Sequence, residues 1–248
     1  MVDIGVDDLL TRSFDLIASI IEAKSSEELL SEISSVAKKC GFEHVLIGAQ
    51  WLDSRGELCY DVLSGYPSEW QERYAEKGYM KIDPTISYCQ NNLRPLIWAE
   101  SHFNRGDCME LFEEARGAGL SFGMSIPIHD AAGVKTMVSL ARDQAFDDDS
   151  REAERLEKIG SILGNIAHFS YRRLIMPQIQ GALPKKLTSN EMTALRWVAN
   201  GKTSWETGCI MNIAEPTVVF HLNNAMRKLN VVNRPQAIAA AFRLRLLE

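Results

Sequence analysis

Three aromatic residues with polar groups on their rings stand four positions apart: Tyr66, Trp70 and Tyr74. This spacing places their side chains along nearly one face of a helix. Asp83 follows directly before Pro84, which holds it in an extended conformation. An aspartate among aromatic rings needs hydrogen-bond donors, and a ligand amide N–H would be a strong one. The set is therefore a candidate binding site, although such a stripe is also typical of an ordinary helix-to-sheet core.

Catalytic and metal chemistry find little support in the sequence. The five cysteines are odd in number and include no C-x-x-C pair, so we expect buried thiols rather than disulfides or a zinc ribbon. Cys59, Cys89, His44 and His129 could serve an enzyme only as isolated groups, because they form no recognisable nucleophile and base motif. A zinc-dependent hydrolase would need zinc-binding histidine clusters, which are missing. We expect no enzyme, no metal and no cofactor.

Length and charge describe a globular protein with two unlike parts. The chain has 248 residues, of which 46% are hydrophobic and 24% charged, enough for two ordinary domains. It has no apolar run of the roughly 18 residues that a membrane span needs, and its first ten residues carry three aspartates, so we expect a cytoplasmic protein without membrane contact. The residues from 183 on carry nine basic and four acidic groups, a net charge of +5, against -6 for the whole chain. The basic module is expected to face a polyanion.

The N-terminal part predicts helices and paired strands in alternation. Helical patterns cover 6–22 and 26–40, a helix starts at Pro67, another ends at Gly117 or Gly119, and a long amphipathic helix covers 150–175. Two hairpins are expected from strands at 43–52, 58–63, 122–129 and 134–142. After Pro84 the pattern is less regular. This order predicts an α+β sensor domain over 1–175, an α/β/α sandwich with an antiparallel sheet that can enclose a small molecule.

The C-terminal part predicts an all-α domain with a helix-turn-helix. Two prolines and a glycine mark a linker over 176–186, and the domain follows over 187–248. Its four helices are expected at 188–200, 203–210, 214–229 and 233–245, with a capping box from Thr188 to Glu191. The expected small core consists of Leu195, Trp197, Val198, Ile210, Ile213, Val218, Leu222 and Leu229.

The segment 187–242 resembles the DNA-binding domain of LuxR-type transcriptional regulators. Sixteen residues fall where that family's pattern places them: Leu187, Thr188, Glu191, Leu195, Gly201, Lys202, Thr203, Glu206, Ile213, Thr217, Val218, Phe220, His221, Asn224, Lys228 and Leu229. The sequence departs from the pattern at Thr207, Gly208, Ala214, Pro216 and Val219. The resemblance implies that helix 214–229 enters the major groove of promoter DNA.

The expected DNA contacts fall into two groups. Asn223 can pair with adenine and Val219 can touch only a thymine methyl group, so we hypothesise a preference for A·T steps there. Phosphate contacts, which fix register without reading sequence, are expected from Lys202, Arg227, Lys228 and Arg234. The resemblance completes the predicted set with Thr203, Thr217, His221 and Asn224.

The N-terminal part resembles the same family's sensor domain, which binds N-acyl-homoserine lactones. The resemblance rests on Y-x-x-x-W-x-x-x-Y from Tyr66, on D-P-[TV]-[IV] from Asp83, on Trp98, and on G-x-[ST]-[IM]-P from Gly123. It implies that Trp98 and Tyr66 bind lactone or amide oxygens, and that Asp83 accepts the amide N–H. Ser139 or Thr85 would add a hydrogen bond, and the ring and acyl chain would pack against Trp70, Tyr74, Ile86 and Leu111.

The resemblance further implies a homodimer that binds a palindromic site, with helix 150–175 as a candidate dimer face. Burial of the lactone would stabilise the DNA-competent form. A ligand-independent regulator with the same DNA-binding domain remains an alternative. A response regulator is a weaker one, because a receiver domain should show alternating strands and helices with an early acidic pair.

Overall fold

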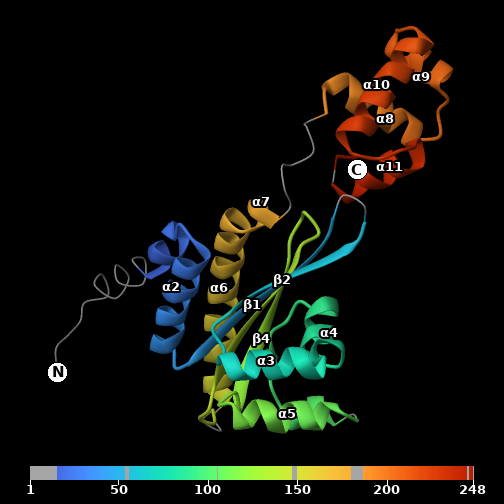
Figure 1. Ribbon diagram of the computed structural model, residues 1–248. Coiled ribbons are helices and arrows are strands. Elements are labelled where there is room, and N and C mark those ends of the chain that lie inside the picture. Colours follow the sequence, from blue (N-terminus) through green and yellow to red (C-terminus); the bar gives the residue numbers. More distant parts are fainter. Residues whose placement is uncertain are drawn as a thin grey trace. The chain divides into compact units, whose positions relative to one another are not determined.

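The computed structural model describes residues 16–53, 56–104, 106–146, 150–179, 187–244 and 246–247. Its contacts divide the chain into two compact units, which are described separately. One unit contains the sheet and the helices up to Met176, and the other contains the helices from Ser189 on (Figure 1).

The first unit is built on a five-stranded sheet in the order β2-β1-β5-β4-β3. The strands are β1 (His44–Leu52), β2 (Leu58–Ser64), β3 (Leu96–Ile97), β4 (Phe122–His129) and β5 (Lys135–Arg142). The pairs β1–β5, β4–β5 and β3–β4 are antiparallel. The antiparallel sheet predicted from the two hairpins is confirmed, and the short β3 is added at its edge.

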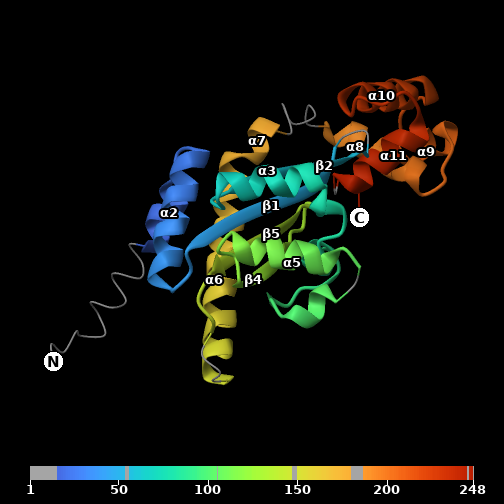
Figure 2. The same ribbon diagram turned by 60° about the horizontal axis from the view of Figure 1, so that its bottom comes forward.

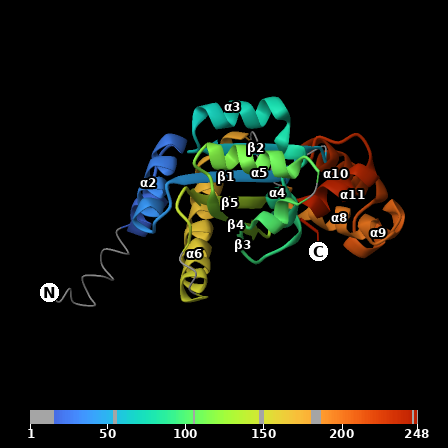
Figure 3. The same cartoon turned by 90° about the horizontal axis from the view of Figure 1, so that it is seen from below.

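Different helices cover the two faces of this sheet (Figures 2 and 3). On one face, α6 (Ser150–Leu174) packs against β4, β5 and α2 (Ser26–Lys39). Gly160 and Gly164 permit this approach, because a Cβ atom at Gly160 would lie 2.8 Å from the sulfur of Met124 and one at Gly164 would lie 2.9 Å from Ile126. Helices α3 (Ser68–Lys77), α4 (Pro84–Asn91) and α5 (Cys108–Gly117) lie on the other face.

Period-two alternation in β1 explains why the sheet has two faces of different character. Val45 and Ile47 are fully buried on the α6 side, whereas Leu46 and Gly48 are half-buried and line a space on the other side. The α/β/α sandwich predicted from the sequence is therefore the fold of this unit.

Two helices differ from the sequence prediction. Helix α4 occupies the stretch that was expected to be less regular, because Asp83 is its N-cap and Pro84 suits its first turn. Helix α7 (Met176–Ile179) occupies the start of the predicted linker; residues 180–186 of that linker lie outside the described residues. Short 3₁₀ turns, η1 (Tyr79–Lys81) and η2 (Glu100–Phe103), complete the unit. Of the helix expected at 6–22, the structure describes 16–22, which is helical.

The second unit contains α8 (Ser189–Ala199), α9 (Ser204–Met211), α10 (Glu215–Lys228) and α11 (Arg234–Arg243), close to the four helices predicted. Capping boxes begin α8 at Thr188 and α9 at Thr203. Asn212 adopts the left-handed conformation that ends α9 and allows α10 to start three residues later. Together α9 and α10 form the expected helix-turn-helix.

The small core of this unit differs from the predicted one at the side of α9. Leu195, Val218, Leu222 and Leu229 are buried as expected, but Ile210 is 46% exposed and Trp197 is only half-buried. The buried core also includes three alanines of α11, Ala237, Ala240 and Ala241, which pack closely because they are small. The expectation of buried thiols also needs correction, since Cys89 is buried but Cys209 is exposed.

The described ranges contain neither a membrane-spanning helix nor a cluster of metal-ligating side chains. No helix there is long and apolar enough to cross a membrane. The same part of the chain contains no group of three or more His, Cys, Asp or Glu residues that could hold a metal ion.

Candidate functional site

A cavity of about 500 Å³ lies between one face of the sheet and the helices α3, α4 and α5. Its lining includes all nine residues that the sequence predicts as ligand-binding: Tyr66, Trp70, Tyr74, Asp83, Thr85, Ile86, Trp98, Leu111 and Ser139. These residues come from three helices, one strand and three connecting segments. The fold therefore brings the predicted set together around one space, and their role in binding a ligand stays a prediction.

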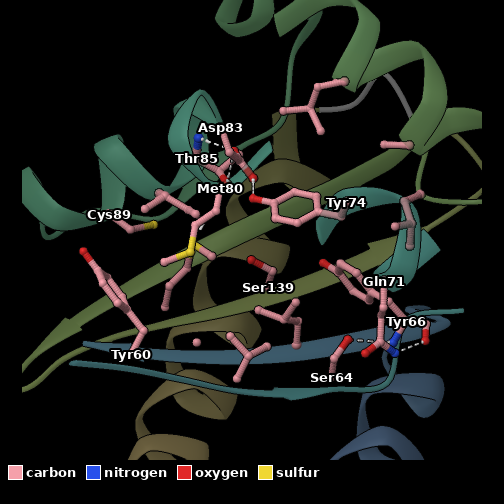
Figure 4. Close-up of a pocket in the computed structure, with 18 of the residues that line it drawn as sticks. Tyr60, Ser64, Tyr66, Gln71, Tyr74, Met80, Asp83, Thr85, Cys89 and Ser139 are labelled. Carbon is pink, nitrogen blue, oxygen red and sulfur yellow. Dashed lines mark hydrogen bonds between the residues drawn. The ribbon is translucent and has the colours of Figure 1, made fainter. Parts of the chain in front are cut away.

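Asp83 is an acidic group of the cavity wall that is held by several hydrogen bonds. As N-cap of α4, it accepts hydrogen bonds at Oδ1 from the amide N–H of Thr85 (2.8 Å) and its hydroxyl (2.7 Å). Oδ2 accepts one from the hydroxyl of Tyr74 at 2.9 Å (Figure 4). Burial raises the pKa of Asp83 above its ordinary value, and the hydrogen bonds from Thr85 and Tyr74 oppose that rise. Because a carboxylate can accept about four hydrogen bonds, Asp83 can serve a further donor in the cavity.

Tyr66 and Tyr74 supply hydroxyl groups to the same region, where Figure 4 shows them near Ser139. Burial, and then the negative charge of Asp83, raise the pKa of both phenols well above the ordinary value. Both hydroxyls therefore stay protonated and remain hydrogen-bond donors. The hydroxyl of Tyr74 is committed to Asp83, so Tyr66 is the phenol that can donate to a ligand oxygen.

The two tryptophans of the predicted set differ in their hydrogen bonds within the protein. The indole N–H of Trp98 donates to Ser125 Oγ at 2.9 Å, and Ser125 Oγ lies 2.9 Å from Ser139 Oγ. Trp98 is thus already paired within the protein, whereas the Trp70 indole N–H makes no hydrogen bond among the described residues. Trp70, expected only to pack against a ligand, therefore also offers a donor, and the ligand roles of both tryptophans stay predictions.

An ionic cluster fastens α3 to α5 beside the cavity. Arg73 bonds Glu114 with two nitrogens, at 2.9 Å and 2.7 Å, and the hydroxyl of Tyr79 donates to Glu114 at 2.9 Å. These bonds lower the pKa of Glu114 to about 2, with the hydrogen bond from Arg73 as the largest cause. The cluster holds Trp70 and Tyr74, on α3, over the same space as Leu111 of α5.

The cavity also has lining residues that the sequence prediction missed. Tyr60 and Val62 on β2 are 47% and 56% exposed, and Met80 on η1 is 40% exposed. These partly exposed apolar side chains form the mouth of the cavity. The alternation of Tyr60 and Val62 in an edge strand was a usable signal, since it points both side chains to one face. Gln71, another lining residue, donates its amide to the Tyr66 carbonyl oxygen at 2.7 Å.

In the second unit, the outer face of α10 presents a set of exposed side chains at helical spacing. Thr217, Phe220, Asn223 and Arg227 are exposed, while Val218 and Leu222 face the core. Val219, predicted to touch a base, is half-buried. Phe220, which is 60% exposed, was not among the predicted DNA contacts. Its spacing from Asn223 and Arg227 was the signal that could have included it.

The residues predicted to contact phosphates differ in the ion pairs and hydrogen bonds that their side chains make within the protein. Lys228 Nζ lies 2.6 Å from Glu191 Oε2, in a pair whose side chains are 18% and 5% exposed. This pair joins α10 to α8, so Lys228 has a structural partner, and its predicted phosphate contact stays a prediction. Lys202 forms only a long pair of 3.9 Å with Glu206, and Thr203 caps α9 through Glu206. Arg227, His221, Asn224 and Arg234 stay predicted contacts, and Arg227 donates to Asn224 at 3.0 Å.

Comparisons with known proteins agree with both units. Residues 25–174 match the family described as "Autoinducer binding domain", and residues 185–241 match "Bacterial regulatory proteins, luxR family". The transcriptional activator AnoR of Acinetobacter nosocomialis is 35% identical over 94% of this chain and 98% of its own. The transcriptional activator VanR of Vibrio anguillarum is 33% identical over 88% and 90%.

Solved structures show the same fold. SdiA of Escherichia coli matches with a TM-score of 0.78 and 24% identity over 96% of this chain and 99% of SdiA. A structure of SdiA in complex with octanoyl-rac-glycerol matches with a TM-score of 0.79 at the same identity, over 97% and 98% of the two chains. The family of these relatives consists of transcriptional regulators rather than enzymes. The chain therefore belongs to the LuxR family of bacterial transcriptional regulators, with an autoinducer-binding domain followed by a helix-turn-helix DNA-binding domain.

Proposed function

We propose that the autoinducer of this regulator is an N-acyl-homoserine lactone, bound in the cavity between the sheet and α3, α4 and α5. The observation that carries this proposal is the buried carboxylate of Asp83 beside the donors Tyr66 and Trp70. A lactone amide offers one N–H for Asp83 and one carbonyl oxygen for Tyr66, and its ring carbonyl suits the unpaired N–H of Trp70. The apolar remainder of the cavity suits an acyl chain.

The head group distinguishes this ligand class from other amphiphiles. An acylglycerol, such as the octanoyl-rac-glycerol in the SdiA complex, has hydroxyl groups but no amide N–H. The test is to express the full chain in a lactone-producing host and to identify the copurifying small molecule by mass spectrometry. We expect one equivalent of an intact acyl lactone, and a loss of about tenfold or more in affinity for the Asp83→Asn variant. Recovery of an acylglycerol alone would contradict the proposal.

Ligand dependence is tested separately, because a ligand-independent regulator is the alternative. Binding to the folded state stabilises it by RT ln(1 + [L]/Kd), about 2.7 kcal/mol at a hundredfold excess over Kd. We therefore expect the lactone to raise the melting temperature of the full chain. The match of residues 25–174 to an autoinducer-binding domain leaves no place for the receiver domain of a response regulator.

We further propose that the regulator acts in the cytoplasm as a homodimer on palindromic promoter DNA. Ile162 and Phe169 support the dimer, because these apolar side chains on α6 are 55% and 54% exposed and lie seven residues apart, on one face of the helix. Substituting aspartate for both should give monomers in sedimentation experiments and weaken DNA binding. Lys158→Ala, at an exposed position of the same helix, is the control and should stay dimeric.

On DNA, α10 is the proposed reading helix, with Thr217, Phe220 and Asn223 toward the bases and Arg227 toward a phosphate. Asn223 suits an adenine, and Phe220 can pack on a thymine methyl group more readily than the half-buried Val219. A binding profile for Asn223→Ala should lose discrimination at one base pair of each half-site. An unchanged profile would remove Asn223 from the base-reading set.

A further inference from the structure

Beyond the head-group region, the sheet presents three rows of paired residues on β1, β5 and β4, and the β1 and β5 members of each row line the cavity. The first row contains Leu46, Ser139 and Ser125. The middle row contains Gly48, Met137 and Pro127, and the end row contains Gln50, Lys135 and His129. Since residues of one row face the same side of the sheet, the three rows form a track that leads away from the head group.

The middle row is apolar and leaves open space. A Cβ atom at Gly48 would meet only Leu46 at 3.7 Å and Met137 at 4.0 Å, which is ordinary contact. Glycine weakens a strand interior, and it is typical of places where a ligand approaches the backbone closely. Gly48 therefore marks the position where a tail can lie directly on the sheet.

The end row closes the track with polar groups that hold the C-terminal end of α4. Lys135 Nζ donates to the carbonyl oxygen of Gln90 at 2.5 Å, and Gln90 Nε2 donates to Gln50 Oε1 at 2.6 Å. His129 Nε2 lies 2.7 Å from the carbonyl oxygen of Cys89. Carbonyl groups in the last turn of a helix lack intrahelical partners, so these bonds explain why polar residues stand here. Gln50, Gln90 and Lys135 also line the cavity, and so they form a polar wall across its end.

We propose that this polar wall is a length stop for the acyl tail, and that it selects medium chains of about eight carbons. The proposal rests on the proposed function and adds the chemistry of the tail. Ser139 and Lys135 stand four residues apart, which corresponds to about 13 Å along a strand. An extended chain advances roughly 1.2 Å per bond, as the polypeptide backbone does, and the last carbon keeps about 4 Å from the wall. About eight carbons fit.

The wall also determines which group the far end of the tail can carry. A terminal methyl group in contact with Lys135, Gln50 and Gln90 displaces water from one ammonium and two amide groups. Because a methyl group cannot replace the hydrogen bonds that this water makes, the contact is unfavourable. A terminal hydroxyl group can accept from the remaining N–H groups of Lys135 or Gln50. The wall therefore disfavours longer methyl-ended tails and favours a tail of fitting length that ends in a hydroxyl group.

The experiment measures the affinity of the full-length protein for butanoyl, hexanoyl, octanoyl, decanoyl and dodecanoyl homoserine lactones, and for the octanoyl lactone with a terminal hydroxyl group. We expect the affinity to peak at octanoyl and to fall about tenfold by dodecanoyl. The terminal hydroxyl group should tighten octanoyl binding about tenfold. In Lys135→Met, which keeps the length of the side chain but loses the ammonium, the peak should move to longer chains and the hydroxyl advantage should disappear.

Two variants separate selectivity from folding. Lys135→Arg keeps a donor for Gln90 and should retain the preference for the octanoyl lactone. The short butanoyl tail does not reach the wall, so the affinity for the butanoyl lactone should be the same in Lys135→Met and Lys135→Arg as in the wild type, provided that Asp83 remains in place. Gly48→Val fills the middle row, so it should weaken octanoyl binding while sparing butanoyl. Equal or tighter wild-type binding of dodecanoyl would show that the tail leaves at the mouth between Tyr60 and Met80, and would overturn the length stop. No binding of any lactone would overturn the proposed function itself.

Discussion

The hydroxyl of Tyr74 donates a 2.9 Å hydrogen bond to Oδ2 of Asp83, which joins α3 to the N-cap of α4 at the edge of the cavity. Two of the elements that surround the ligand space are therefore held together by one carboxylate. The remaining acceptor capacity of that carboxylate is available to a ligand, so the same group that organises the empty cavity can recognise its occupant.

Ligand affinity should fall as the pH is lowered. Burial raises the pKa of Asp83 in the empty protein, while a ligand N–H favours the ionised form. Below the raised pKa, binding must release a proton, and affinity falls by at most about tenfold per pH unit. Calorimetric titrations from neutral to acidic pH measure this slope. Asp83→Asn should flatten it, and the exposed Glu69→Gln should not.

The empty protein should respond to pH in the opposite sense through the same group. Because the folded pKa of Asp83 lies above its ordinary value of 3.8, the folded state binds the proton more tightly than the unfolded state does. This contribution to stability is full below the ordinary value and declines as the pH rises through the raised one. A bound lactone that supplies an N–H to Asp83 should reduce this loss of stability as the pH rises.

Gly123→Ala should displace Trp98 and weaken ligand binding. A Cβ atom at Gly123 would lie 2.7 Å from the Trp98 ring and 2.6 Å from the carbonyl oxygen of Leu140, so either the ring or the strand must move. We expect a loss of about 1–3 kcal/mol in the free energy of unfolding. Gly117→Ala is the matched control, since nothing lies within 4 Å of its Cβ position. Equal effects of the two substitutions in urea titrations would contradict this account.

Glu114→Gln should loosen α3 from α5 and remove part of the acid sensitivity of the unit. The pKa of Glu114 is lowered from 4.5 to about 2, so its ion pair with Arg73 contributes fully above the ordinary value and is lost as the pH falls toward about 2. Chemical denaturation gives the free energy of unfolding at neutral and at acidic pH. The difference between these two values should be smaller for the variant than for the wild type. Glu113→Gln, whose exposed pair with Arg116 is 3.5 Å long, should behave as the wild type.

Substitutions of two adjacent basic residues on α10 should have different effects on stability and on DNA binding. Arg227→Ala should leave stability unchanged and reduce the slope of DNA affinity against salt by about one phosphate contact. Lys228→Met should lower stability by about 3 kcal/mol, because it leaves the buried Glu191 without its cation. Thermal unfolding and salt-dependent DNA titration separate the two effects. A Lys228 variant of full stability with a reduced salt slope would restore its role as a phosphate contact.

The sequence by itself determined the fold class and the set of residues that line the cavity. Helical spacing brought Trp70 and Tyr74 to one face of α3, directly after Tyr66, and the proline after Asp83 favoured its extended backbone; both are local effects of a few residues. Capping boxes at Thr188 and Thr203 and the helix-turn-helix spacing are equally local. The nine predicted residues therefore line one cavity because the family pattern and local geometry agree.

Hydrogen-bond pairing and burial were decided only by the tertiary structure. The donor of Trp98 is used by Ser125, 27 positions away, and Lys228 is paired with Glu191, 37 positions away, so neither role could be read from neighbours in the chain. The polar wall of Gln50, Gln90 and Lys135 arises where two strands and a helix end meet. Such long-range contacts depend on strand register and helix packing, which local residue patterns do not specify.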